Sequence, residues 1–412
     1  MTEKAISGPV RTLLERGVVM PAPETVQVAD EVVPERIAPG VVLHPGTRLS
    51  GDDLSIGPES VVGKEGPAVL DACQLGHNVS FKGGYARGAV FLDEASIGSG
   101  AHIRPGTILE EQASGAHTVG FKQTILLSYV TAGSLINFCD CLMAGGTSRK
   151  RHSEVGSSYI HFNFTAHGDK ATPSLIGDVP RGVLLDQAPI FLGGQGGLVG
   201  PVRIEYGVVL AAGTIQRKDA LEAGCLYSGT PMSAGGRAPR PYVQGRYGAV
   251  DRLIRNNLIY YGNIQALQAW YRRARMRLMR ADPFREACRL GAIKQLDGVL
   301  KERLKRLQQL AEKLSDSVGS LKSDPAGADT DRIIRQQERF VEAWPSMRDQ
   351  LKRALPDEPG AEMRDQFLAE WERTEGDDHV RAVRALTPDA RAAATGWLQA
   401  IVDRAAALFP GD

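Results

Sequence analysis

The chain has 412 residues, which is too long for one compact core and indicates two or three domains. Its hydrophobic fraction of 42% and its charged fraction of 24% are typical of a soluble globular protein. A formal net charge of +1 gives no argument for nucleic acid or an acidic membrane surface as a partner. No apolar stretch is long enough to cross a bilayer, so no membrane-spanning helix is expected.

Three further features bear on location and organisation. The first residues, MTEKAISGPVRTLLERG, lack the charged start and apolar core of a secretory signal. The five cysteines are odd in number and lack the spacing of a disulfide framework, so a reducing cytoplasm is expected. Most of the 46 glycines fall in the first 245 residues, whereas all four tryptophans lie beyond them. Two different architectures therefore share the chain.

Residues 1–33 are predicted to form a short helix and a lead-in, and residues 34–232 carry a repeat. Aliphatic residues recur there at every sixth position, in blocks of three or four. The blocks are Ile37, Leu43 and Leu49; Ile97, Ile103 and Leu109; Val130, Ile136 and Leu142; and Leu192, Leu198, Ile204 and Leu210. A period of six fits neither an α-helix nor one long alternating strand.

This period predicts a β-solenoid with a triangular coil, in which each side takes six residues and points one aliphatic side chain inward. Equivalent side chains of successive coils would stack at about the 4.8 Å spacing of strands. Glycine, asparagine and proline would occupy the corners, where the backbone needs a positive or a fixed φ. The alternative is a β-sandwich with accidental spacing, which four consecutive in-phase positions followed by AAGT disfavour.

Five segments of this region resemble a known family. They are IGSGAHIRPGTI (97–108), LSYV (127–130), VGSSYIHFNF (155–164), LIGD (175–178) and LGGQGGLVGPVRIEYGVVLAAGT (192–214). In this order they resemble the C-terminal acetyltransferase domain of the bifunctional glucosamine-1-phosphate acetyltransferase and N-acetylglucosamine-1-phosphate uridyltransferase. The resemblance implies a left-handed parallel β-helix of the hexapeptide-repeat acyltransferases and a homotrimer. No uridyltransferase signature is found near the N-terminus, so pyrophosphorylase chemistry is not predicted.

The resemblance also implies a substrate site for a sugar phosphate or a sugar nucleotide such as UDP-N-acetylglucosamine. The matching positions are Arg104, Lys122, Tyr129, Asn163, Phe164 and Lys170. An arginine offers a bidentate fork to a phosphate, and lysines act as point charges. The alternative for each cation is a solvated surface charge.

The family binds acetyl-coenzyme A along the groove between protomers, so acetyl-CoA or another acyl-CoA is the implied cofactor. Ser157, Gly194 and Ala212 stand at the matching small positions, and Arg217 and Lys218 are near where phosphates would pass. Small residues suit the close approach of a pantetheine arm, but they also suit the corner of a tight coil.

One departure from the family concerns catalysis. The histidine that acts as general base immediately before the LSY stretch is Leu126 here, and leucine cannot accept a proton. His161 and His167 are the candidate replacements. The alternative is that one is a buried, hydrogen-bonded histidine and the other a loop residue.

Residues 137–154, NFCDCLMAGGTSRKRHSE, appear as an extra segment relative to the family. The glycines followed by cations favour either a phosphate nest or an exposed basic loop. A metal site from Cys139, Cys141, His152 and His161 is a further alternative, but a CxC with scattered histidines is weak evidence, and no metal is predicted.

A linker at 233–248 leads to a helical region at 249–412. Val250, Ile254, Leu258, Ile264 and Leu267 form one apolar stripe. Asp282 and Pro283 form an N-cap signature, and leucines then continue a helix to about Gly319. SDPAGAD (323–329) ends that helix, and further helices are predicted at about 329–355, 360–376 and 388–408. The tail would pack on the solenoid flank or between subunits and govern assembly, and a protein partner recruited through the tail is an alternative.

The leading hypothesis is a cytoplasmic homotrimer of acyltransferase type that acts on, or binds, a sugar phosphate or sugar nucleotide. The rival is a non-catalytic trimeric scaffold or ligand sensor, which Leu126 favours. A metal-dependent lyase or hydratase is a third, weaker hypothesis.

Overall fold

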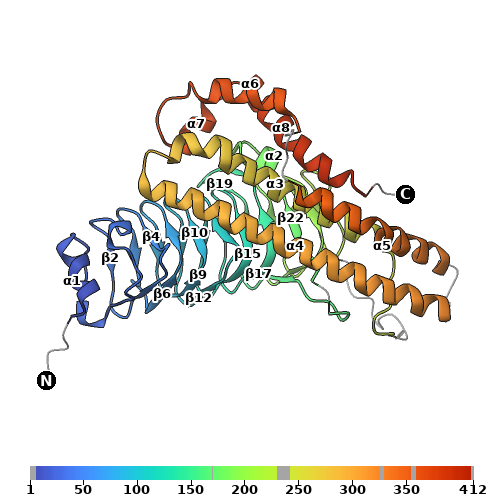
Figure 1. Ribbon diagram of the computed structural model, residues 1–412, viewed down its shortest axis with the longest axis horizontal. Coiled ribbons are helices and arrows are strands. Elements are labelled where there is room, and N and C mark those ends of the chain that lie inside the picture. Colours follow the sequence, from blue (N-terminus) through green and yellow to red (C-terminus); the bar gives the residue numbers. More distant parts are fainter. Residues whose placement is uncertain (1–5, 169, 230–241, 325–328, 354–358, 410–412) are drawn as a thin grey trace.

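The computed structural model describes residues 6–168, 170–229, 242–324, 329–353 and 359–409. Figure 1 shows a β-solenoid that runs from left to right, with a group of helices lying along its flank. All ladder pairs of the solenoid are parallel, and the region after residue 250 is helical. The predicted fold class, a parallel β-helix followed by an all-helical region, is therefore confirmed.

The solenoid begins with α1 (Gly8–Glu15), in which Val10 and Leu13 lie one turn apart and are buried against the first coil. Two short 3-10 helices, η1 (Pro23–Thr25) and η2 (Pro34–Arg36), follow. The first strand starts at Gln27, ahead of the start at residue 34 expected from the repeat.

Three faces make up the coil. The first face contains β1 (Gln27–Val28), β3 (Arg48–Ser50), β6 (Ala68–Asp71), β9 (Gly84–Arg87), β12 (Ala101–Ile103), the first halves of β15 (Gly120–Leu126) and β17 (Asn137–Met143), β21 (Ile160–Phe162), β24 (Gly197–Val199) and β27 (Ile215–Gln216). The second contains β4 (Ser55–Ile56), β7 (Gln74–Leu75), β10 (Ala89–Phe91), β13 (Thr107–Leu109), the second halves of β15 and β17, β22 (Ser174–Ile176) and β25 (Arg203–Ile204). The third contains β2 (Val42–Leu43), β5 (Val61–Val62), β8 (Ser80–Phe81), β11 (Ser96–Ile97), β14 (Ser114–Gly115), β16 (Thr131–Ala132), β20 (Glu154–Val155), β23 (Phe191–Leu192), β26 (Val209–Leu210) and β28 (Leu226–Tyr227).

The six-residue repeat carries the chain from one face to the next. Ile97, Ile103 and Leu109 lie on β11, β12 and β13, one on each face, and all three are buried. Each such side chain removed from water stabilises the fold by roughly 1.5–3 kcal/mol. The core of the solenoid is therefore the stack of these inward positions, as the periodicity predicts.

Residues 137–154 are not simply an insertion into the repeat. Residues 137–143 form β17, which pairs with β15 over its whole length and supplies one full rung of two faces. Only the segment after it leaves the coil, as an antiparallel hairpin of β18 (Gly146–Ser148) and β19 (Arg151–His152). The expected extra loop is therefore a coil plus a short projecting hairpin.

The helical region follows the predicted order. It contains α3 (Asp251–Met279), α4 (Pro283–Ser323), α5 (Thr330–Lys352), α6 (Ala361–Trp371), α7 (His379–Arg384) and α8 (Pro388–Ala406). The side chain of Asp282 caps α4 by accepting hydrogen bonds from the backbone N–H groups of Phe284 and Arg285, both at 2.9 Å. Residues 233–241 of the expected linker, and 325–328 of the expected break, lie outside the described residues. The short α7 was not predicted.

The helices dock on the second face of the solenoid. The long helix α4 runs along β4, β7, β10 and β13, and α3 reaches β22 and the short α2 (Val179–Gly182). Gln295 accepts a hydrogen bond from the backbone N–H of Gly106 at 2.9 Å. Of the two placements left open by the sequence, the flank of the same chain's solenoid is therefore the one observed.

Buried ion pairs reinforce this docking. Arg275 of α3 pairs with Glu110 and Glu111, which follow β13. Arg303 of α4 contacts Asp140 of β17 at 3.0 Å, and both side chains are almost fully buried. Burial raises the pKa of Glu110. Burial also acts to raise the pKa of Glu111, but the charge and hydrogen bond of Arg275, together with His379 and a backbone hydrogen bond, lower that pKa to about 2. These pairs fix the tail to the coil at two separate rungs.

Candidate functional site

A cavity of about 330 Å³ opens on the first face, beside the edge of β21. The residues that line it come from four successive rungs and the loop after β21. They are Arg104, Lys122, Asn137, Cys139, Ile160, His161, Phe162, Asn163, Phe164 and Lys170. The structure thus places five of the six predicted substrate residues, and one of the two candidate bases, at a single cavity.

The register of the coils explains why these residues meet. The Cα atoms of Lys122 and Cys139 are ladder partners in β15 and β17, and Arg104 follows β12 directly on the preceding rung. Asn137 pairs in turn with Ile160 of β21. Residues far apart in sequence are therefore stacked at the strand spacing of about 4.8 Å along one side of the coil.

The charge of this cavity is positive. Arg104, Lys122 and Lys170 line it, and no carboxylate does so among the described residues. The nearby acids are engaged elsewhere, since Asp140 pairs with Arg303 and Glu302 pairs with Arg306. Three cations without an acidic partner in the described part of the cavity favour an anionic ligand.

Two exposed phenylalanines flank the cations. Phe162 is 40% exposed and Phe164 is 66% exposed, and the neighbouring Ile160 is 41% exposed. Large apolar side chains at a charged cavity offer a surface for a sugar ring, a base or another protein chain.

His161 lies at the base of this cavity, but both of its ring nitrogens are engaged. Nδ1 lies 2.5 Å from the carbonyl oxygen of Cys139, and Nε2 lies 2.7 Å from the hydroxyl of Ser174. A carbonyl oxygen only accepts, so Nδ1 carries the proton and Nε2 accepts from Ser174. Burial lowers the pKa of His161 to about 4. Neither nitrogen is left to take a proton from a substrate in this conformation.

The thiol of Cys139 also faces the cavity, where a guanidinium nitrogen of Arg104 lies 3.7 Å from Sγ. Burial raises the pKa of this thiol, with Asp140 adding to the shift and the nearby cations opposing it. The group is therefore a neutral thiol at pH 7, which is a poor nucleophile.

His167 and Tyr129 lie away from the cavity. The ring of His167 packs on Tyr247 at 4.4 Å, and its Nδ1 accepts a hydrogen bond from Gly245. Tyr129 occupies a corner between the second and third faces, with a φ of +73°, and its hydroxyl contacts Arg384. Leu126 is buried in the second face between Leu109 and Met143.

The predicted cofactor residues separate into two groups. Ser157, Gly194 and Ala212 stack at the corner between the third and first faces, where the N–H of Gln195 bonds to Ser157 and the N–H of Gly213 bonds to Gly194. A Cβ on Gly193, next to this corner, would lie 2.4 Å from the backbone nitrogen of Ala212, so a side chain at that position would collide with the following rung. Arg217 and Lys218 are exposed at the following corner, beyond β27.

Three lining residues were missed by the sequence reasoning. Asn137, Ile160 and Phe162 point outward because they alternate with the buried Phe138 and His161 along their strands. Because Asn137 follows the buried Ile136, the repeat marks it as an outward position, and its partner on the preceding rung is Gly120, two residues before Lys122.

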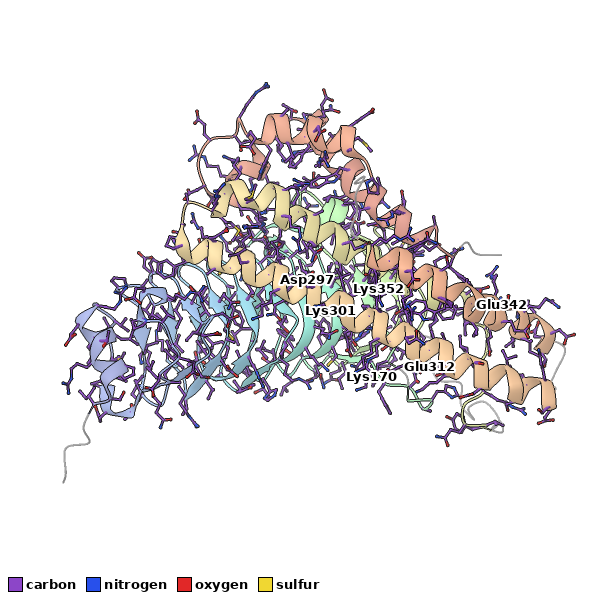
Figure 2. The ribbon with its side chains drawn as sticks, in the orientation of Figure 1. Lys170, Asp297, Lys301, Glu312, Glu342 and Lys352 are labelled. Atoms are coloured by element: carbon purple, nitrogen blue, oxygen red, sulfur yellow. The ribbon has the colours of Figure 1, made fainter. Side chains whose placement is uncertain are left out.

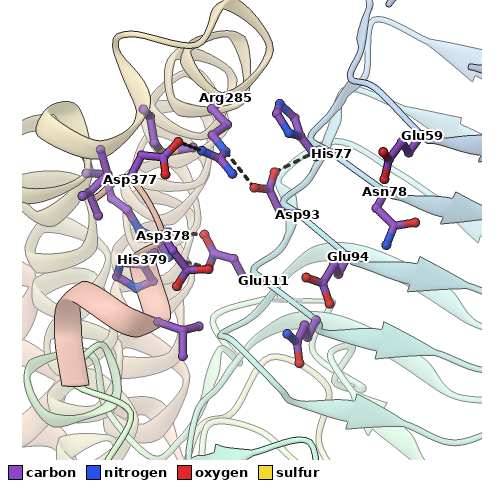
Figure 3. A pocket seen from close by; sticks show the side chains of 15 residues that line it. Glu59, His77, Asn78, Asp93, Glu94, Glu111, Arg285, Asp377, Asp378 and His379 are labelled. Carbon is purple, nitrogen blue, oxygen red and sulfur yellow. Dashed lines mark hydrogen bonds and ion pairs between the residues drawn. The ribbon is translucent and has the colours of Figure 1, made fainter. Parts of the chain in front are cut away.

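A second cavity, of about 220 Å³, has the opposite charge. It lies where the solenoid meets the tail, and Figure 3 shows Arg285 between Asp93 and Asp377 there. Its acidic lining consists of Glu59, Asp93, Glu94, Glu111, Asp377 and Asp378. An anionic ligand would be repelled from it. The first-face cavity is thus the better candidate for a phosphate.

The alternative metal site finds no geometric support in the described residues, where no three His, Cys, Asp or Glu side chains are placed to hold a metal ion. His152 instead contacts the carbonyl of Arg149 and lies near Glu154. Every helix in the described part of the chain is too short or too polar to cross a bilayer.

Comparisons with known proteins point to one group. No family model matches the chain. The chain is 28% identical to the bifunctional protein GlmU of Geotalea uraniireducens over 210 residues, 51% of this chain and 41% of that protein. It is 26% identical to the bifunctional protein GlmU of Thermotoga petrophila over 215 residues, 51% of this chain and 42% of that protein. The chain thus spans about two fifths of the length of these curated relatives.

Solved structures add little. The UDP-N-acetylglucosamine O-acyltransferase of Moraxella catarrhalis aligns at 13% identity over 74% of this chain and 97% of that one, with a TM-score of 0.27. A score this low supports no inference. The six-residue repeat, the parallel solenoid built from it and the match to the bifunctional proteins together support assignment of this chain to the hexapeptide-repeat acyltransferase superfamily.

Proposed function

We propose that the first-face cavity binds the phosphate of a sugar phosphate or a sugar nucleotide, of which UDP-N-acetylglucosamine is the leading candidate. The observation that carries this proposal is the convergence of Arg104, Lys122 and Lys170 on a cavity without a carboxylate in its described lining. Each charge-assisted hydrogen bond to a phosphate contributes about 1.5–3 kcal/mol, so three cations provide a basis for selective binding.

Asn163 and Phe164 would then lie beside the sugar. Asn163 offers a donor and an acceptor to hydroxyl groups, and the exposed ring of Phe164 offers an apolar face. Arg303 supports this arrangement, because it donates to the carbonyl of Lys170 at 3.1 Å and holds the loop on the coil.

The chemistry proposed with this site is acyl transfer from acetyl-CoA or another acyl-CoA. The amine or hydroxyl of the sugar would attack the thioester carbonyl, the C–S bond would break, and the thiol of coenzyme A would leave. The small-residue corner at Ser157, Gly194 and Ala212 would accept the pantetheine arm between two copies of a homotrimer. The exposed Leu135, Ile160 and Phe162 on the first-face side support such a contact between copies.

The alternative is a non-catalytic trimeric scaffold or sugar-nucleotide sensor. The observation that favours it is the engagement of both nitrogens of His161, together with the burial of Leu126. In the described part of the cavity no unengaged base faces the ligand position, so transfer would need a base from another copy or a rearrangement of His161.

We also propose a reducing cytoplasmic location, which the presence of five free cysteines supports.

Isothermal titration tests the binding proposal. Glucosamine 1-phosphate and UDP-N-acetylglucosamine should bind, whereas neutral N-acetylglucosamine should bind far more weakly. Arg104→Ala should raise the Kd of the phosphate ligand by about 10- to 100-fold, because one charge-assisted contact is lost. Arg48→Ala, an exposed arginine on the same face, is the matched control and should leave the Kd unchanged. Equal binding of the neutral sugar, or unchanged binding by Arg104→Ala, would contradict the proposal.

Release of coenzyme A thiol from acetyl-CoA in the presence of glucosamine 1-phosphate then separates the two functions. Thiol release that requires the sugar phosphate supports transfer. Tight sugar binding without thiol release supports the sensor.

A further inference from the structure

A groove of about 940 Å³ lies on the tail, along the α3–α4 hairpin, and shares no lining residue with the first-face cavity. The residues around it are Tyr261, Gln265, Gln268, Ala269, Arg272, Arg273, Arg289, Leu290, Ile293, Asp297, Leu300, Lys301, Leu304, Leu351, Lys352 and Arg353. Nothing in the proposed acyltransferase function uses this surface.

The floor of the groove is an apolar stripe of α4. Leu290, Ile293, Leu300 and Leu304 are spaced so that they lie on one side of the helix. Leu290 is 52% exposed, which is unusual for a leucine beside a cavity. At 1.5 Å per residue, the stripe from Leu290 to Leu304 is about 21 Å long, which matches a partner helix of about 14 residues.

The rim of the groove is strongly basic. Arg272, Lys301, Lys352 and Arg353 line it, and Asp297 is the one acid among its described lining residues. Asp297 already accepts a hydrogen bond from Gln268 at 2.6 Å and lies 3.9 Å from Arg272. Figure 2 labels Asp297 and Lys301 on α4 and Lys352 at the end of α5.

The position of α5 suggests the shape of the occupant. This helix packs along the C-terminal part of α4 and ends at Lys352, where the hydroxyl of Tyr261 donates to the carbonyl of Leu351 at 3.1 Å. The groove begins at this end of α5. The surface of α4 that α5 covers on one side of Lys352 therefore continues on the other side, where none of the described helices covers it.

We propose that this groove docks an acidic amphipathic helix of a partner protein. Such a helix would set its apolar face on the leucine stripe and its carboxylates against the basic rim, as a continuation of α5. An anionic acyl chain fits less well, because the exposure of Leu290 shows that the floor is open, and a chain lying there would leave much of its apolar surface in water.

Fluorescence anisotropy with a labelled synthetic peptide of about 16 residues tests this proposal on the full chain. The peptide carries leucines at i, i+3, i+4 and i+7 and glutamates on both flanks. It should bind saturably and at least about 10-fold more tightly than a peptide of the same composition in scrambled order. Leu290→Asp and Lys301→Glu should each weaken binding by about fivefold or more. Lys305→Glu, an exposed lysine of the same helix outside the groove, is the matched control and should bind like the wild type.

Several results would overturn the proposal. One is that the scrambled peptide binds as tightly as the helical peptide. Another is that Lys305→Glu weakens binding of the helical peptide as much as Lys301→Glu does. A third is that laurate or phosphatidylglycerol vesicles bind saturably whereas the helical peptide does not bind. Far-ultraviolet circular dichroism of each variant keeps a folding defect from being read as a binding defect. Sugar-phosphate binding is measured on the same samples, so failure here is distinguishable from failure of the proposed function.

Discussion

At the residue scale, the candidate site shows what a six-residue register can and cannot predict. The positions of Arg104, Lys122, Asn163, Phe164 and Lys170 followed from a resemblance, and the stacking of rungs brings them to one cavity. Tyr129 was expected with them but lies at another corner of the coil, against Arg384 of the tail. The register assigns residues of the flat sides to a face, whereas Tyr129 stands at a corner with a φ of +73°, where the direction of a side chain depends on the local backbone. The roles of these residues in binding stay predictions.

The state of His161 depended on partners that no local pattern reveals. Its two contacts come from Cys139 on the preceding rung and Ser174 on the second face of its own rung, so only the folded chain shows that both nitrogens are engaged. The sequence alternative of a buried, hydrogen-bonded histidine describes it in this structure.

Because two histidines are buried, we expect the free energy of unfolding to fall in acid. Burial lowers the pKa of His161 to about 4 and that of His379 to about 3, from 6.5. The unfolded chain therefore binds more protons below pH 6.5, so this contribution to stability is present above pH 6.5 and is lost as the pH falls toward 4 and 3. Lowering the pH from 7 to 5 should therefore reduce the free energy of unfolding by about 2 kcal/mol for each of these histidines.

Urea denaturation of His379→Leu at these two pH values measures the effect. The decrease in the free energy of unfolding of this variant between pH 7 and pH 5 should be about 2 kcal/mol smaller than the decrease in the wild type. The variant His102→Leu, which replaces an exposed histidine, is the control and should keep the wild-type loss. An identical pH dependence in His379→Leu and the wild type would show that His379 does not titrate as expected.

At the element scale, most of the helices could be predicted but their docking could not. The apolar stripe and the Asp282 N-cap located α3 and α4, because helix periodicity and capping are local signals. The six-residue α7 is too short for a period to appear. The contact of Arg303 with Asp140 joins residues 163 positions apart, and no sequence pattern marks such a pair.

Arg303 should be a main determinant of tail docking. Arg303→Met leaves Asp140 buried without its cation, which should lower the free energy of unfolding by about 3–5 kcal/mol. Adding Asp140→Asn removes the uncompensated charge while keeping a residue that tolerates its φ of +60°, so the double variant should recover part of the loss.

Chemical denaturation of the two single variants and the double variant gives the coupling between the residues. Additive losses, or a loss below 1 kcal/mol in Arg303→Met, would argue against a coupled buried pair.

At the scale of the whole molecule, the tail determines which faces are open to other copies. The described helices cover the second face and, within the described part of the chain, leave the first and third faces for contact between protomers. On the third face, Phe191, Val209 and Leu226 are ladder partners on successive rungs and are 41%, 37% and 69% exposed. A continuous apolar row of this kind is typical of a buried protein interface.

We therefore expect a homotrimer in which this row is covered. Light scattering coupled to size exclusion should give three times the chain mass for the wild type. Val209→Asp should shift the population to monomer, because a charge would be buried at the interface. Val33→Asp, at an exposed position of the first coil away from this row, is the control and should remain trimeric. A monomeric wild type, or trimeric Val209→Asp, would contradict this assembly.

The central claim is that the first-face cavity holds the phosphate of a sugar ligand. The most direct measurement is a crystal structure of the protein with UDP-N-acetylglucosamine. Phosphate oxygens should lie about 3 Å from the side-chain nitrogens of Arg104 and Lys122, with Lys170 closing over them. Ligand density at the acidic cavity or the tail groove, with the first-face cavity empty at saturating ligand, would contradict the claim.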